Sequence, residues 1–107
     1  YPLKTKTRKK TQKQREKEIQ KDLASKLDGE VEVTCKTGRV DILTETKIIE
    51  VKVVKDWKHA VGQLSIYGLE FPDKQKEVVL FGKTSNEMKQ MITSFCSELN
   101  ISVKFKD

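Results

Sequence analysis

Two acids and one lysine stand inside apolar segments, where charged side chains are not expected. Glu50 and Lys52 interrupt the run IIEVKVV at 48–54, and Asp41 interrupts the run RVDILT at 39–44. Burying an unpaired charge is strongly unfavourable, so these side chains need a partner or a bound ion. Two converging carboxylates would supply the hard oxygen ligands that Mg²⁺ or Mn²⁺ requires.

Side-chain alternation along the strands decides how these charges are arranged. The run at 48–54 is apolar enough for an interior strand, and its period of two places Glu50 and Lys52 on the same face. A turn at 45–46 would fold the strand that carries Asp41 back beside Glu50. We therefore expect Asp41 and Glu50 to converge on one point. For a Glu-x-Lys pair alone, a structural salt bridge or a half-exposed strand is the simpler interpretation.

A third acid lies in the segment 12–28, where apolar residues recur every four positions and predict a helix. At 100° per residue, Glu16 falls in the middle of the apolar arc that begins at Ile19. We expect Glu16 to face the interior. The alternative is an exposed residue in the first turn that compensates the helix dipole.

Gln63 and Tyr67 lie four residues apart on a second predicted helix and share one face, with Lys58 one turn before them. Taken alone, this pair is typical of a helix surface with a partly buried aromatic ring.

Positive charge is concentrated near the N-terminus of a chain whose net charge is +6. Residues 1–17 hold eight basic side chains and one acid. This density suits phosphate binding, although a solubilising tail or a localisation signal has the same composition. We predict a basic arm at 1–12 and one domain at 13–107. The residues of this region expected to bind nucleic acid are Lys4, Lys6, Arg8, Lys9, Lys10, Lys13 and Arg15.

Hydrophobic periodicity predicts an α/β fold in the order αβββαβαβ, with a central mixed sheet flanked by helices. A capping box of Thr84 and Glu87 marks the start of the third helix, and Asp56 is expected to cap the second. The predicted strands are 31–35, 39–44, 47–54, 77–81 and 101–105, and the helices are 12–28, 57–70 and one that follows Thr84.

The composition is that of one globular domain. The chain has 107 residues, of which 36% are hydrophobic and 36% charged. No apolar run is long enough to span a bilayer, and no signal leader is recognisable. Cys35 and Cys96 lack the spacing of a zinc site or a disulfide framework and are expected to be buried thiols. We expect no contact with a membrane and an intracellular setting, in the cytoplasm or the nucleus.

Asp41, the sequence Glu50-Val51-Lys52 and the stretch GQLSIYG at 62–68 together resemble the PD-(D/E)XK nuclease superfamily. The Gln-x-x-x-Tyr helix is similar to that of its RecB-like and exonuclease branches. Glu16 in REKEI resembles the first-helix glutamate of archaeal Holliday-junction resolvases. No proline precedes Asp41, which departs from the usual motif. The resemblance implies a three-layer, restriction-endonuclease-like core.

The resemblance also implies a metal site. Asp41, Glu50 and the backbone carbonyl of Val51 would hold one Mg²⁺ or Mn²⁺. Glu16 would reach a second ion directly or through water. The implied activity is metal-dependent hydrolysis of DNA by an endonuclease that leaves 5′-phosphate and 3′-hydroxyl ends.

Further roles follow from the same resemblance. Lys52 would orient the attacking water or stabilise the transition state, and Gln63 would position that water or a phosphate oxygen. Tyr67 and Lys58 would contact the nucleic acid.

Two other classes of function stay open. One is a DNA-binding module that keeps the fold without turnover, and the other is a structural or oligomerisation domain with a buried ion pair. The expected partner is DNA. Because one site cuts one strand, a duplex cutter of this size would act as a homodimer or with domains outside this chain.

Overall fold

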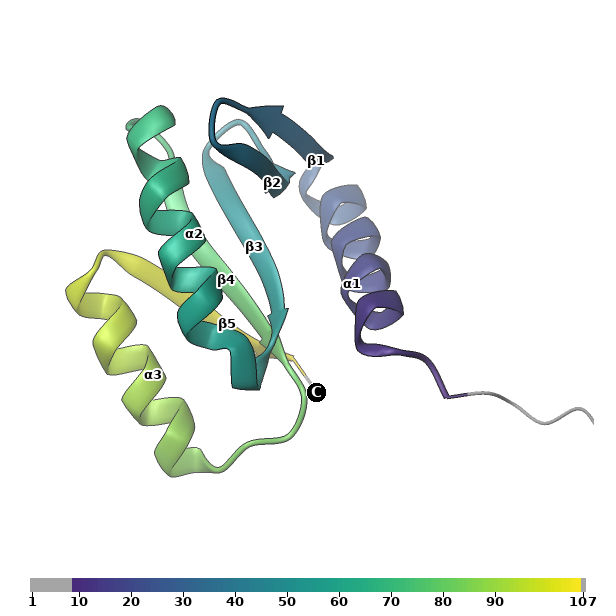
Figure 1. Cartoon of the computed structure of the whole chain (residues 1–107), viewed down its shortest axis with the longest axis vertical. Coiled ribbons are helices and arrows are strands. Elements are labelled where there is room, and N and C mark those ends of the chain that lie inside the picture. The colour runs from purple at the N-terminus through teal and green to yellow at the C-terminus, as the bar shows by residue number, and fades with distance from the viewer. Residues whose placement is uncertain (1–8, 107) are drawn as a thin grey trace, which may run out of the picture.

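A computed structural model describes residues 9–106 of the chain, and the elements follow the predicted order (Figure 1). The predicted arm residues Lys4, Lys6 and Arg8 lie outside the described residues. A short 3₁₀ turn, Val54–Asp56, precedes the second helix. The elements are α1 (Gln12–Leu27), β1 (Glu30–Cys35), β2 (Gly38–Leu43), β3 (Lys47–Val53), α2 (Trp57–Glu70), β4 (Gln75–Phe81), α3 (Asn86–Glu98) and β5 (Ile101–Lys106).

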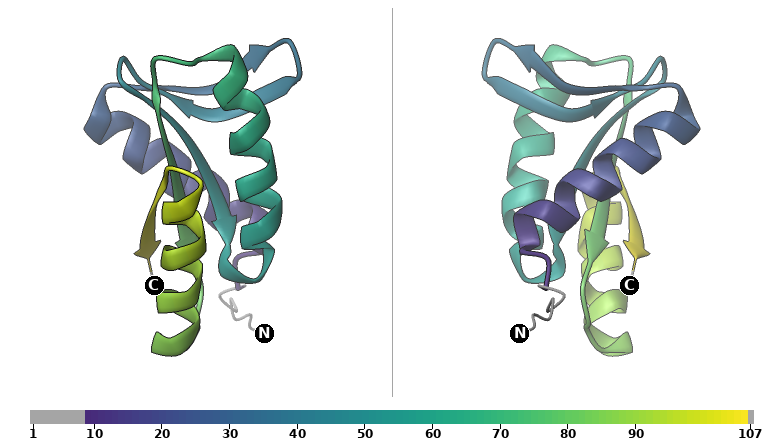
Figure 2. Two further views of the ribbon diagram at one scale, coloured as in Figure 1. Left: turned by 90° about the vertical axis from the view of Figure 1, so that its left-hand side faces the viewer. Right: turned by 90° about the vertical axis from the view of Figure 1, so that its right-hand side faces the viewer.

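The five strands form one mixed sheet in the order β1-β2-β3-β4-β5. The pairs β1–β2 and β2–β3 are antiparallel, whereas β3–β4 and β4–β5 are parallel. Helix α1 covers one face of the sheet, and α2 and α3 cover the other (Figure 2). The prediction of an α/β fold with a mixed sheet between helices is confirmed.

Strand β3 lies at the centre of the sheet, as its apolar run predicts. Ile49 and Val51 pack in a core cluster with Ile19 of α1, whereas Ile48 packs in a second cluster with Leu64 of α2. This alternation places Glu50 on the side of the sheet that α2 covers. An interior strand with helices on both faces therefore buries this carboxylate without any contribution from loops.

Helix ends are set by local side-chain bonds. Thr11 and Gln14 form a reciprocal capping box at the start of α1, with Thr11 Oγ1 accepting from the Gln14 N–H at 3.1 Å. The predicted capping box of Thr84 and Glu87 is wrong. Ser85 takes the cap position, in an extended conformation, and accepts from the Met88 N–H at 3.1 Å.

Three smaller predictions also meet a definite outcome. Asp56 stands at the cap position of α2, but its side chain makes no capping bond, because the 3₁₀ turn leads directly into the helix. Cys96 is buried, whereas Cys35 is only half-buried. Across residues 9–106, no helix combines the length and the apolar character needed to cross a bilayer.

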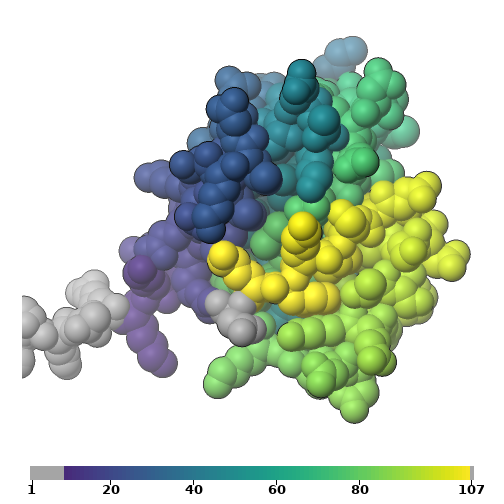
Figure 3. All heavy atoms as spheres, turned by 180° about the vertical axis from the view of Figure 1, so that it is seen from behind, coloured from purple at the N-terminus to yellow at the C-terminus, as the bar shows by residue number. Residues whose placement is uncertain are grey.

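The far side of the molecule brings the two sheet edges into view. Strand β5 and helix α3, in yellow and yellow-green, form one flank, and α1 with β1, in purple and blue, forms the other (Figure 3). Asp41 on β2 is one strand away from the edge strand β1, whereas Glu50 on β3 lies in the middle of the sheet.

Gly38, at the start of β2, lets the hairpin approach α2 closely. A Cβ atom added there would lie 2.8 Å from Tyr67 Oη, while the next nearest atoms are at 3.5 Å. Tyr67 is itself buried in the core. The absence of a side chain at position 38 therefore allows the Tyr67 hydroxyl to sit beneath the hairpin.

We predict that Gly38→Ala lowers the free energy of unfolding by about 1–3 kcal/mol, because the Tyr67 hydroxyl must move and because φ at this position is +157°. The loss should be smaller when the substitution is made in Tyr67→Phe, which removes the contacting oxygen. Urea denaturation of the single and double variants measures this coupling.

The matched control is Gly62→Ala, within α2, where an added Cβ meets no atom within 4 Å. This change should stabilise the helix by about 0.5–1 kcal/mol. Equal losses from Gly38→Ala with and without the tyrosine hydroxyl would contradict the proposed close contact.

Candidate metal and phosphate site

Strands β2 and β3 stop pairing through their backbones just where Asp41 and Glu50 stand. The ladder contains Leu43↔Ile48 and Ile42↔Ile49 and then ends. Beyond it, the Asp41 N–H donates to Glu50 Oε2 at 2.9 Å, and the Val51 N–H donates to Asp41 Oδ2 at 2.8 Å. Each carboxylate thus binds a backbone N–H of the opposite strand, and the two acids converge as the sequence predicts.

Burial makes this pair of carboxyls hard to ionise. Glu50 is 1% exposed, and its pKa is raised to about 8, first by burial and then by the charge of Asp41. The Asp41 N–H and Lys52 act in the opposite direction. The pKa of Asp41 is also raised by burial, against the Val51 N–H and Lys52. A cation placed here would relieve the repulsion between the two acids.

Glu77, the other buried acid of the sheet, has an ion-pair partner. Glu77 is 4% exposed and forms an ion pair with Lys47 at 3.1 Å. Glu50 has no such partner among residues 9–106, and Lys52 enters none of the ion pairs found there. The interpretation of Glu50 and Lys52 as a structural salt bridge is therefore not supported.

A pocket of about 280 Å³ opens beside Asp41, whereas Glu50 lies behind Asp41 and does not line it. Its walls come from α1, β1, β2, β3 and α2, so it forms only when the hairpin, the central strand and two helices are assembled. The lining residues are Lys13, Glu16, Lys17, Gln20, Glu32, Arg39, Asp41, Lys52, Gln63 and Tyr67.

Helix α1 contributes the third acid. Glu16 lines the pocket and is half-buried, so the prediction that it faces inward agrees with the structure. Burial raises the pKa of Glu16, Lys52 lowers it and the charge of Asp41 raises it. Glu16 therefore shares an electrostatic environment with both strand residues.

Helix α2 contributes an unsatisfied acceptor and a buried ring. Gln63 Oε1 is buried and has no hydrogen-bond partner among the described residues, although such an atom normally has one. Tyr67 is 5% exposed and belongs to the core, and burial followed by the Glu50 charge raises its pKa. Lys58 is exposed and lies beyond this pocket, near Gln63 on a neighbouring surface.

The basic residues expected to bind nucleic acid have different surroundings. Lys13 lines the pocket. Lys10 pairs with Glu18 at 2.6 Å, and Lys9 lies on the adjoining surface at the start of α1. The guanidinium of Arg15 lies 4.8 Å from the centre of the Phe81 ring, so its side chain packs on the sheet.

The sequence does not predict that Lys17, Glu32 and Arg39 meet at the mouth of the pocket. Lys17 and Arg39 both pair with Glu32, at 2.5 Å and 3.3 Å. Glu32 has a positive φ of 52°, which alternation in β1 does not reveal. From the sequence, Lys17 only adds to the positive charge of residues 1–17.

The described residues bring together two carboxylates as candidate metal ligands and no more. The described residues hold no group of three or more His, Cys, Asp or Glu side chains that could bind one ion. Asp41 and Glu50 are the adjacent pair, and Gln63 Oε1 is an oxygen with no partner in the part of the chain that the structure describes. Glu16 is therefore not placed to complete a three-carboxylate site.

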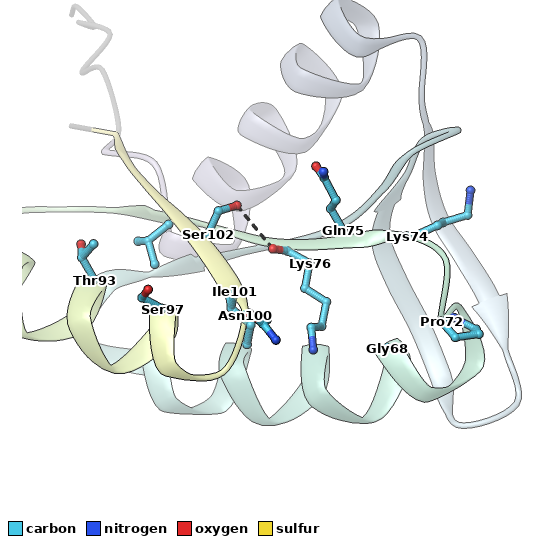
Figure 4. A pocket seen from close by; sticks show the side chains of 11 residues that line it. Gly68, Pro72, Lys74, Gln75, Lys76, Thr93, Ser97, Asn100, Ile101 and Ser102 are labelled. Carbon is cyan, nitrogen blue, oxygen red and sulfur yellow. Dashed lines mark hydrogen bonds between the residues drawn. The ribbon is translucent and has the colours of Figure 1, made fainter.

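A larger pocket, of about 820 Å³, lies where the end of α2 meets the starts of β4 and β5 (Figure 4). Its lining is rich in hydroxyl, amide and lysine side chains, and the Ser102 hydroxyl donates to the Lys76 carbonyl at 3.3 Å. No carboxylate, imidazole or thiol lines it. The acids whose pKa values are raised lie at the smaller pocket or beside it instead.

Three proteins of Acanthamoeba polyphaga mimivirus are similar to this chain. KilA-N domain-containing protein L33 is 45% identical over 85 residues, which are 79% of this chain and 34% of that protein. KilA-N domain-containing protein R878 is 35% identical over 85 residues, which are 79% of this chain and 24% of that protein. A third KilA-N domain-containing protein is 48% identical over 59 residues, or 55% of this chain and 16% of that protein.

This chain thus spans about a third or less of the curated relatives it matches. No protein-family profile matches it, and no solved structure does. The restriction-endonuclease-like arrangement is therefore not confirmed beyond the α/β fold with its mixed sheet.

The expected membership of the PD-(D/E)XK superfamily is wrong, because the relatives are named for the KilA-N domain and none is named a nuclease. The motif residues have local physical reasons to occur together. Asp41 and Glu50 satisfy backbone N–H groups where two strands diverge, and Tyr67 fills the core. The presence of these motif residues in the expected order is therefore not specific for the PD-(D/E)XK superfamily.

We predict that the free energy of unfolding falls as pH rises from about 5 to about 8 in the presence of a chelator. The folded chain keeps a proton on Glu50, whose pKa is about 8, after the unfolded chain, with a carboxyl near 4.5, has released it. The slope contributed by one such proton is at most about 1.4 kcal/mol per pH unit.

Urea denaturation across this pH range measures the effect, and Glu50→Gln should reduce the slope. The raised pKa values of Asp41 and Glu16 act in the same direction, so part of the slope should remain. An equal slope in Glu50→Gln would mean that Glu50 is not the group that holds the proton.

Proposed function

We propose that this chain binds a divalent cation, Mg²⁺ or Mn²⁺, at Asp41 and Glu50 and hydrolyses DNA phosphodiester bonds there. The observation that carries the proposal is an adjacent pair of carboxyls, with Glu50 buried and Asp41 half-buried. The pair has no ion-pair partner among residues 9–106, and a pocket with several lysines lies beside Asp41. The proposal rests on the site and not on any family name.

Residues of the pocket, together with the adjacent Glu50 and Val51, would take the roles that hydrolysis requires. The Asp41 and Glu50 carboxylates, with the Val51 carbonyl, would hold the cation. When bound, a divalent cation polarises a phosphate oxygen and lowers the pKa of a coordinated water. Lys52, which lines the pocket without an ion pair, would stabilise the charge that develops on the phosphate.

Two further side chains would orient the reacting groups. Gln63 Oε1 lacks a partner within residues 9–106 and would accept a hydrogen bond from the attacking water. Glu16, on the facing wall, would act through water or at a second ion. Tyr67 is too deeply buried to serve as a broad contact for nucleic acid, so we propose that it supports the hairpin through Gly38 instead.

A DNA-binding module without turnover is the second candidate. One observation favours it: each carboxylate already accepts a backbone N–H, so both acids have a structural reason to be present. Against it, Asp41 lines the pocket, where an ionised carboxylate would weaken phosphate binding. Hydrolysis explains the position of the two acids better.

A duplex has two strands, whereas this chain offers one such pocket among its described residues. We propose that cleavage of both strands requires a homodimer or the remainder of a longer protein.

We predict that Mn²⁺ binds to the wild-type chain and that Asp41→Asn abolishes this binding, because one of two anionic ligands becomes neutral. Isothermal titration calorimetry at neutral pH measures it. The matched control is Asp73→Asn, which neutralises an exposed acid of the α2–β4 turn and should leave binding unchanged. Equal binding to Asp41→Asn and wild type would remove the cation from this position.

We predict that Lys52→Ala lowers the rate of Mg²⁺-dependent DNA cleavage by about 100-fold or more, as loss of an electrostatic catalytic group commonly does. Single-turnover cleavage of end-labelled duplex DNA measures the rate. Lys55→Ala, at an exposed lysine of the turn before α2, is the control and should cleave almost normally. Wild-type cleavage by Lys52→Ala would contradict its catalytic role.

A further inference from the structure

Glu32 holds two cations at the mouth of the pocket. Its Oε2 lies 2.5 Å from Lys17 Nζ, and its Oε1 lies 3.3 Å from Arg39 Nη1. Lys17 comes from α1, Arg39 from β2 and Glu32 from the edge strand β1. The three residues also line the pocket that contains Asp41.

The exposure of the three side chains shows which of them can change partner. Lys17 is 51% exposed and Arg39 is 64% exposed, whereas Glu32 is 28% exposed. The cations therefore lie on the solvent side, with room to turn outward. Glu32 is held between them on a backbone of positive φ.

The bridging carboxylate resembles a phosphodiester in its charge and in its pair of terminal oxygens. Each has two terminal oxygens that share one negative charge, and here each oxygen meets one cation. Lysine and arginine are the side chains that neutralise backbone phosphates, and arginine adds a forked donor geometry that suits them. Glu32 thus occupies the place that a phosphate would take between Lys17 and Arg39.

We propose that Lys17 and Arg39 form a binding subsite for one backbone phosphate of DNA, and that Glu32 is an internal competitor which this phosphate displaces. The subsite lies at the mouth of the pocket whose wall includes Asp41 and Lys52, and it would fix the strand relative to that pair. The inference rests on the proposed function for its choice of DNA, but it does not require hydrolysis.

The experiment measures binding of a fluorescein-labelled 20-base-pair DNA duplex by anisotropy, in EDTA, over a series of NaCl concentrations. In Lys17→Gln/Arg39→Gln, affinity should fall and the slope of log K against log[salt] should flatten by about 0.9, the value for one neutralised phosphate. In Glu32→Gln, affinity should rise by about threefold to fivefold, the order expected when an exposed ion pair is removed.

A control separates local competition from a general change of charge. Glu45→Gln removes the same charge at an exposed turn residue that forms no ion pair among residues 9–106. It should raise affinity less than Glu32→Gln does. When Glu32→Gln is added to Lys17→Gln/Arg39→Gln, its effect should shrink to that of the control, because no cations remain to be released.

Two results would overturn the subsite: equal effects of Glu32→Gln and Glu45→Gln, or an unchanged salt slope in the double variant. Melting temperatures of all variants verify that each is folded. EDTA prevents metal-dependent cleavage, so the two proposals fail separately. If the effect of Glu32→Gln on DNA affinity depends on Lys17 and Arg39 but Mg²⁺ supports no cleavage, only hydrolysis is refuted. If Mg²⁺ supports cleavage but the effect of Glu32→Gln does not depend on Lys17 and Arg39, only the subsite is refuted.

Discussion

Two crossed hydrogen bonds between β2 and β3 organise this molecule. The strands leave their ladder after Ile42↔Ile49, and the N–H groups beyond that point would be unsatisfied in a buried sheet. Across the gap, the Glu50 side chain accepts a hydrogen bond from the Asp41 N–H, and the Asp41 side chain accepts one from the Val51 N–H. The divergence of the strands and the presence of the acids therefore depend on each other, and the pocket opens beside them.

The same bonds explain why this site is electrostatically unusual. The sheet buries Glu50 between α2 and its neighbouring strands, and two backbone N–H groups offset only part of the cost of two carboxylates. Glu77, equally buried, has Lys47 beside it. The unpaired acids thus lie deep while Lys17 and Arg39 lie at the mouth, an arrangement in which a cation inside and a phosphate outside would each meet opposite charge.

The corrected family assignment shows a limit of short motifs. Asp41, Glu50 and Tyr67 each have a packing or hydrogen-bonding role in this structure. Their structural roles alone can therefore explain their spacing, without any shared activity. The similarity to KilA-N domain-containing proteins of a mimivirus is carried by 85 residues in the two longer matches. Chemistry at the site therefore has to be established from the site itself.

The sequence by itself determined the order of the elements, the interior position of β3 and the inward direction of Glu16, because each depends on periodicity within one segment. It also indicated that Asp41 and Glu50 converge, since a tight turn joins their strands. Only the tertiary structure decided that Glu32 bridges Lys17 and Arg39. That cluster needs a positive φ in β1 and the passage of α1 across the hairpin, and neither leaves a periodic signal along the chain.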